Sequence, residues 1–271
     1  MNLQWQEWLN LFVRWFHVIA GITWIGQTYL FNWMERVLTP PQGPGKENIS
    51  GELWMVHGGG FYLVEKQKWP EIMPKALHWF RWEAGLTWIT GVLLLGIVYW
   101  EGAPLLEYGS SFSRAQGIGL SIGVLVGGWV AYDLLWGSPL GKNEPVCAAL
   151  SWGLIMALAY GLSGVFSNRA VYLHIGAMFG TIMVANVWMR ILPAQRRMIA
   201  LTKEGGVPDP SLAARAGRCS RHNTYMSVPL IFTMISNHFP ATTFGRPHNC
   251  LILGALIIFG WGAAKVIREH L

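Results

Sequence analysis

The sequence predicts an all-α protein, a polytopic bundle of about seven transmembrane helices. Of its 271 residues, 52% are hydrophobic and 13% are charged, whereas soluble domains carry about 25% charged residues. The apolar residues gather in runs close to the ~17–25 residues that a membrane-spanning helix needs. The chain also holds 16 tryptophans, a residue type that collects at the two interfaces of a bilayer.

The runs that qualify as spans, or nearly so, are residues 9–31, 84–100, 116–136, 146–166, 170–191, 223–239 and 250–266. Two long polar connections interrupt them, residues 32–83 and 192–222. Residues 69–82 mix tryptophan, isoleucine and leucine with charged residues, which is typical of an amphipathic helix at the membrane interface. Insertion of that helix would raise the number of spans to eight. Residues 1–271 are therefore predicted to form a single integral membrane domain.

Lysine and arginine set the expected orientation, because cytoplasmic loops carry an excess of both. Most of these residues lie in the connections 32–83 and 192–222, whereas the opposite loops hold only Arg114, Arg169 and Arg246. The N-terminus is therefore expected outside and the C-terminus in the cytoplasm. The net charge of +6 comes from these loops, so we expect no nucleic-acid partner.

The cysteines exclude several classes of site. Cys147, Cys219 and Cys250 are isolated in the sequence. Without a CxxC pair the chain carries no sign of a disulfide framework, a zinc knuckle or the CxxCH attachment of a c-type haem.

Histidines fall into two layers under this topology. His17, His174 and His238 lie near the predicted outer face, and His57, His78 and His222 lie near the inner face. Imidazole is a common axial ligand of haem iron, and a titratable ring inside an apolar span indicates function. His17 with His174 is the preferred pair for the iron of a b-type haem, with His238 as the substitute. The alternatives are a packing role for His17 and a helix end at His238.

The inner layer predicts a substrate site formed by His57, His78, Arg81, Glu83 and His222. Glycines beside His57 permit close approach of a ligand, and the start of a helix at His222 favours anions. Plainer alternatives are a turn at His57, interfacial anchoring at Arg81 and Glu83, and helix capping at His222. A second haem between His78 and His222 is a further possibility.

Several segments resemble the membrane domain of the bacterial membrane-bound urate oxidases (urate hydroxylases). The matching segments are His57-Gly-Gly-Gly-Phe-Tyr62, Leu77-His-Trp-Phe-Arg-Trp-Glu-Ala84, Gly128-Trp-Val-Ala-Tyr-Asp133 and the stretch from Ser220 to Pro240. The helix of His17 also resembles a broader set that includes membrane protoporphyrinogen oxidases and copper-resistance membrane proteins.

The resemblance implies an enzyme of purine catabolism in the bacterial inner membrane, which oxidises urate to 5-hydroxyisourate and passes electrons to a cytochrome c. It also implies an eighth span and a fused cytochrome c domain, whereas this sequence ends at Leu271 without CxxCH. The cytochrome is then expected as a separate or missing part. The alternatives are a non-catalytic, haem-binding electron-transfer subunit and a protoporphyrinogen oxidase-like or copper-handling protein.

Overall fold

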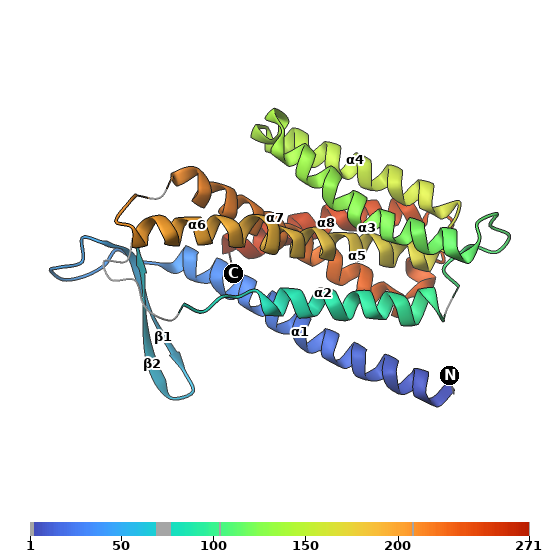
Figure 1. Ribbon diagram of the computed structural model, residues 1–271, viewed down its shortest axis with the longest axis horizontal. Helices are drawn as coiled ribbons and strands as arrows, with labels where there is room; N and C mark the ends of the chain where they lie inside the picture. The colour runs from blue at the N-terminus through green and yellow to red at the C-terminus, as the bar shows by residue number, and fades with distance from the viewer. Residues whose placement is uncertain (1–2, 69–76, 103, 208, 271) are drawn as a thin grey trace.

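The computed structural model describes residues 3–68, 77–102, 104–207 and 209–270, and it confirms an all-α helical bundle (Figure 1). The α-helices are α1 (Leu3–Val37), α2 (Trp82–Leu95), α3 (Arg114–Gly137), α4 (Glu144–Ser163), α5 (Asn168–Asn186), α6 (Leu192–Lys203), α7 (Pro210–Ile235) and α8 (Asn249–His270). Short helical turns are η1 (Gly96–Trp100), η2 (Pro139–Lys142), η3 (Val187–Ile191), η4 (Ser236–His238) and η5 (Pro240–Thr242).

Within the described residues, six helices are long and apolar enough to cross a membrane. The predicted span 223–239 falls mostly on α7, which is not among the six because its first half, residues 210–222, is polar. α7 nevertheless packs against α5 and α8 inside the bundle. Large apolar side chains such as Ile22, Leu134 and Phe259 lie exposed on the helices, as expected for helix faces in contact with lipid.

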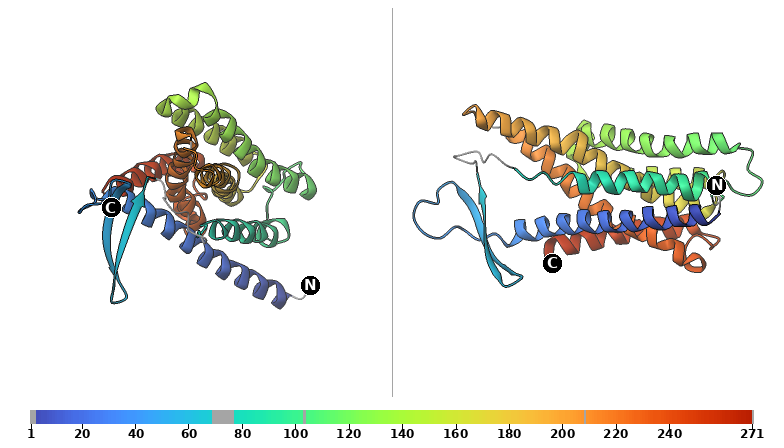
Figure 2. Two further views of the ribbon diagram at one scale, coloured as in Figure 1. Left: turned by 60° about the vertical axis from the view of Figure 1, so that its left-hand side comes forward. Right: turned by 60° about the horizontal axis from the view of Figure 1, so that its bottom comes forward.

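The two ends of the bundle differ. The chain termini lie at opposite ends of it in both views of Figure 2. The amino end carries the N-terminus, the end of α2 and the start of α5. The hairpin end carries the C-terminus, α6 and the start of α7 (Figure 1). Termini at opposite ends fit an odd number of helices running along the bundle.

Helix fills most of the predicted connection 192–222. α5, η3 and α6 run on as one helical segment of 36 residues, and α7 begins at Pro210. Pro193 has no N–H to offer the carbonyl four residues earlier, Met189, and the π-helical turn η3 lies just before it. The side chain of Arg190 donates to that carbonyl through Nη1 at 2.9 Å. The helix therefore continues past this proline.

A β-hairpin that the sequence reading missed occupies much of the connection 32–83. Strands β1 (Ile49–His57) and β2 (Gly60–Gln67) pair antiparallel. Gly58 and Gly59 have φ of +57° and +82°, which suits the two-residue turn between them. The predicted interfacial helix 69–82 falls largely on residues 69–76, outside the described residues. Residues 77–81 are coil and turn, and α2 starts at Trp82.

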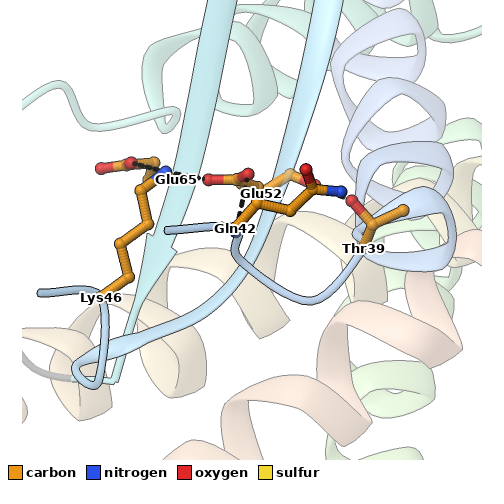
Figure 3. A network of polar contacts seen from close by, with 5 residues as sticks. All are labelled: Thr39, Gln42, Lys46, Glu52 and Glu65. Carbon is orange, nitrogen blue, oxygen red and sulfur yellow. Dashed lines mark hydrogen bonds and ion pairs between the residues drawn. The ribbon is translucent and has the colours of Figure 1, made fainter. Parts of the chain in front are cut away.

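The hairpin projects away from the helices and is held at its base (Figures 1 and 2). Thr39 and Glu52 exchange two backbone hydrogen bonds of 2.9 Å. Figure 3 shows the charged network there: Lys46 pairs with Glu52 and, at 3.2 Å, with Glu65, and the backbone N–H of Gln42 donates to the Glu52 carboxylate at 3.1 Å. These contacts fix where the hairpin leaves the bundle.

Helix α5 forms the centre of the protein, with 83% of its most apolar stretch buried. Small residues let its neighbours approach closely. A Cβ built on Gly176 would lie 2.0 Å from Oγ1 of Thr233 on α7, and one on Gly128 of α3 would lie 2.4 Å from Cγ of Met178. α5 is therefore clamped between α3 and α7, and this fixes the positions of the cavities on its two sides.

Candidate functional site

Two large cavities lie on opposite faces of α5. The first, named here the His17 cavity, is bounded by α1, α2, α5 and the end of α7. The second, the His222 cavity, is bounded by α3, α4, α5, the start of α7 and α8. Their volumes are about 670 and 840 Å³, within the ~300–1,000 Å³ of small-molecule and cofactor sites.

The His17 cavity is mostly apolar and carries its polar groups toward the amino end. Its wall includes Arg14, His17, Gly21, Thr87, Gly91, Tyr99, Arg169, Gly180, Met234 and His238. His17 and His238, the first-choice residue and the substitute of the sequence prediction, therefore line one space.

The ring of His17 is held by α2. Its Nδ1 lies 3.0 Å from the carbonyl oxygen of Thr87 and 3.0 Å from Oγ1 of Thr90. A carbonyl oxygen only accepts, so Nδ1 carries the hydrogen and Nε2 of the neutral ring keeps its lone pair. A metal-ligating histidine shows the same arrangement, because its other nitrogen usually donates to a carbonyl or carboxylate, and so does a histidine that packs one helix on another.

The amino end of the same cavity carries two cations. Arg169 donates from Nε to Oδ1 of Asn237 at 2.7 Å, next to His238, and its guanidinium lies 5.8 Å from the ring centre of Tyr99. Arg14 donates to Asn10 at 3.1 Å. Two exposed guanidinium groups at the rim of an apolar cavity suit a ligand that has a flat apolar body and carboxylates at one edge.

His174 does not face this cavity. It is fully buried, and both ring nitrogens have partners at 2.7 Å, Nε2 with Oγ of Ser121 and Nδ1 with the carbonyl of Ala170. The structure therefore does not bring His17 and His174 together on one wall. His174 has the geometry of a histidine that links α5 to α3.

Arg81 and Glu83 lie at the hairpin end, where α2 begins. The guanidinium of Arg81 lies 5.9 Å from the ring centres of both Trp82 and Trp188. Oε1 of Glu83 accepts a hydrogen bond from Nε2 of Gln27 at 3.4 Å. Among the described residues, Nε of Arg81, Oε2 of Glu83 and Oε1 of Gln27 are buried without a hydrogen-bond partner. Buried polar atoms usually find partners, so this group is able to bind a polar ligand.

The other predicted inner residues lie apart from this group. His57 is exposed at the tip of the hairpin, opposite Gly60. His78 is exposed in the coil before α2, with its ring 4.4 Å from that of Phe80. His222 lines the second cavity, across α5. The structure thus groups Arg81 with Glu83 and separates His57 and His222 from them.

The His222 cavity has its polar groups at the hairpin end. Its wall there includes Tyr132, Trp136, Glu144, Arg221, His222 and Lys265. The ring of Trp136 lies 4.2 Å from that of His222, and Arg221 pairs with Glu144 at 2.5 Å. Toward the amino end the cavity is lined by glycines and aliphatic residues of α3, α4 and α5.

A hydrogen-bonded chain behind His222 was missed by the sequence reading. Asn223 donates to the carbonyl of Met183 at 3.0 Å. Asn186 donates to Oδ1 of Asn223 at 3.0 Å and to the hydroxyl of Tyr132 at 3.1 Å. That hydroxyl lies 2.8 Å from Nδ1 of His222. Asn186 lies 37 positions from Asn223 and 54 from Tyr132. These residues meet only in the folded bundle, so no local sequence pattern predicts their contact.

In the described parts of the chain, no group of three or more histidine, cysteine, aspartate or glutamate side chains is arranged to hold a metal ion. No curated protein and no solved structure matches the chain. A family model described as urate oxidase N-terminal matches residues 4–270. The match spans nearly the whole chain, including both cavities and the Arg81–Glu83 group, and the chain therefore belongs to the urate oxidase N-terminal family.

Proposed function

We propose that the protein is a membrane oxidoreductase that oxidises urate to 5-hydroxyisourate and passes the electrons through b-type haem to a cytochrome c. The observation that carries the proposal is the family match over residues 4–270. The Arg81–Glu83 group supports a substrate site at the hairpin end. The polar residues of the His17 cavity support a haem site at the amino end.

The substrate site is placed at Gln27, Arg81 and Glu83. Urate is a flat ring, largely a monoanion at neutral pH, with N–H donors and carbonyl acceptors around its edge. The guanidinium of Arg81 supplies positive charge and a free Nε–H, and Oε2 of Glu83 and Oε1 of Gln27 are free acceptors. The rings of Trp82 and Trp188, each 5.9 Å from the Arg81 guanidinium, offer apolar faces to a flat molecule.

The reaction releases protons as well as electrons: urate and water give 5-hydroxyisourate, two protons and two electrons. Glu83 is the proposed proton acceptor, because its free carboxylate oxygen lies beside the site and a base must lie within hydrogen-bonding reach of the proton it takes. Arg81 orients the anion and does not titrate.

The His17 cavity fits a b-type haem. Nε2 of His17 is available as a ligand because Nδ1 is bonded to Thr87, His238 of η4 would offer a second imidazole to the same cavity, and Arg14 and Arg169 would suit the two propionates. A haem held there supplies one-electron storage between a two-electron donor and a one-electron acceptor. The amino end would face the outside of the inner membrane, where a cytochrome c is located.

The test is urate-dependent reduction of cytochrome c by the purified protein. Glu83→Gln is expected to lower this rate by about 100-fold, which is typical of a positioned acid–base group. Arg81→Lys is expected to lower it as well, because an ammonium group does not reproduce the planar donors of a guanidinium. The haem spectrum stays unchanged in both variants. Arg114→Lys is the matched control, since Arg114 is exposed at the amino end and pairs with Glu101. If dithionite reduces the haem and urate does not, the protein is an electron-transfer subunit and the proposed enzyme activity is wrong.

A further inference from the structure

We propose that the His222 cavity binds an isoprenoid quinone, with the quinone ring at the hairpin end beside His222 and the tail along α3. The proposal does not rest on urate oxidation, because the cavity lies across α5 from the Arg81–Glu83 group and shares no wall residue with the His17 cavity.

The distribution of polar groups defines the shape of the ligand. The charged side chains, His222 and Tyr132 gather at one end of a cavity of about 840 Å³. Beyond them the wall is mostly glycine, alanine and larger apolar residues, most of them from α3, α4 and α5. A polar molecule as small as a purine would leave most of this apolar volume unfilled. A molecule with one polar ring and a long apolar tail matches both ends.

The hydrogen-bonded chain behind His222 fixes which group the ring offers. The carbonyl of Met183 only accepts, so Asn223 turns its NH₂ to it and its Oδ1 toward Asn186. Asn186 then donates to the hydroxyl of Tyr132, which leaves that hydroxyl its own hydrogen to donate to Nδ1 of His222, 2.8 Å away. A neutral ring that accepts at Nδ1 carries its hydrogen on Nε2. Within the described residues no hydrogen bond uses that Nε2–H, which leaves a donor for a quinone carbonyl.

The charges at the same end favour a neutral head group. Arg221 and Glu144 form an ion pair of 2.5 Å, so a phosphate placed between them would meet a carboxylate as well as a guanidinium. Lys265, which is exposed at the rim, is the remaining cation of the wall. The ring of Trp136, 4.2 Å from that of His222, adds an aromatic surface for a flat ring.

The tail has a path along α3. Gly123 and Gly127 line the cavity, and a Cβ built on either one meets no atom within 4 Å. Both glycines are exposed on the helix surface, so the cavity opens sideways toward the lipid from which a quinone would enter.

The experiment titrates detergent-purified protein with decylubiquinone and also measures the quinone that co-purifies with it, by solvent extraction and chromatography. Gly127→Leu places a side chain in the tail path, and its Cβ meets no atom within 4 Å. It is expected to weaken decylubiquinone binding at least about tenfold, the effect of losing roughly 60 Å² of buried tail. Gly119→Leu is the matched control, because Gly119 lies on the same helix with open space beside it and does not line the cavity.

A second variant addresses the ring end. Tyr132→Phe removes the hydroxyl that holds the His222 tautomer and is expected to weaken decylubiquinone binding about fivefold to tenfold. Equal affinity of the original protein, Gly127→Leu and Tyr132→Phe for decylubiquinone would overturn the proposal. So would mass spectra in which a phospholipid, and no quinone, co-purifies and is lost in Gly127→Leu. Neither result bears on urate-dependent reduction of cytochrome c, which is measured separately.

Discussion

The His17 cavity and the His222 cavity share α5 and α7 as a wall, yet the two histidines are held in opposite ways. Nδ1 of His17 faces a backbone carbonyl and must donate, so Nε2 keeps a lone pair that can bind iron. Nδ1 of His222 faces a hydroxyl that accepts from Asn186 and keeps its own hydrogen to donate, so the proposed tautomer accepts at Nδ1 and carries its hydrogen on Nε2. His174, between them, uses both nitrogens. The partner of one nitrogen decides the chemistry of the other.

The largest expected effect comes from removing the imidazoles one at a time. His17→Ala is expected to abolish the α band of b-type haem in the dithionite-reduced minus oxidised spectrum, and His238→Ala to abolish or strongly shift it, because each removes a proposed ligand of the iron. His222→Ala is expected to keep the band.

His174→Ala separates the two possible pairings. It is expected to keep the haem band and to lower stability by about 2–4 kcal/mol, since it leaves a void and removes the acceptor of the Ser121 hydroxyl in a fully buried place. Loss of the band in His174→Ala with its retention in His238→Ala would restore His17 and His174 as the pair.

The sequence predicted the bundle well because long apolar runs rarely form anything other than membrane-spanning or buried helices. It also placed His17 and His238 in one layer, since depth follows from counting residues along a span. Rotation about the helix axis was not predictable in the same way. His174 lies at the predicted depth but faces Ser121 rather than the cavity, and only the packing of three helices decides this.

The hairpin and α6 were missed for local reasons. Three consecutive glycines after His57 indicate flexibility, whereas two of them serve a tight turn that sets strand register. Residues 192–203 are polar and follow an apolar run, whereas the π turn before Pro193 and the bond from Arg190 let the helix continue into them. The chain behind His222 was out of reach because its members come from three separate helices.

The next effect concerns the wall between the cavities. Gly176→Val would drive a side chain into Thr233, whose Oγ1 would lie 2.0 Å from the new Cβ and is bonded to the carbonyl of Leu230. We expect a loss of about 3 kcal/mol, at the upper end for overpacking, together with weaker ligand binding in both cavities. Thermal unfolding in detergent measures the loss. Gly161→Val on α4, where a Cβ meets no atom within 4 Å, is the control, and an equal loss there would contradict the role of α5 as the wall.

A smaller effect is expected at the chain behind His222. Tyr132→Phe leaves Nδ1 of His222 and one N–H of Asn186 without their partner, which costs about 1–2 kcal/mol. The ¹⁵N resonances of the His222 ring should also change, because the Nε2–H tautomer is no longer imposed. Those of His17 should stay as they are, since its partners lie on α2. Unchanged His222 resonances would mean that the hydroxyl does not set the tautomer.

The smallest effect is expected outside both cavities, at the base of the hairpin. The bond from Lys46, with that from the Gln42 N–H, lowers the pKa of Glu52, and the Glu52 and Glu65 carboxylates raise the pKa of Lys46. The contribution of Glu52 is complete above its unfolded pKa, about 4.3, and is lost as pH falls through the lowered folded value. That of Lys46 is complete below about 10.4 and is lost as pH rises through the raised value.

Hydrogen exchange of the amides of residues 49–67 should therefore be slowest, after correction for intrinsic rates, between about pH 5 and pH 10. Lys46→Met should flatten the dependence at both ends, because it removes the partner of Glu52 as well as the titrating amine. The amides of α5, which contact none of these groups, should show no matching change. Equal dependence in Lys46→Met and the original protein would show that the network does not hold the hairpin. Such a result would leave the two-residue turn and the Thr39–Glu52 backbone bonds as its support.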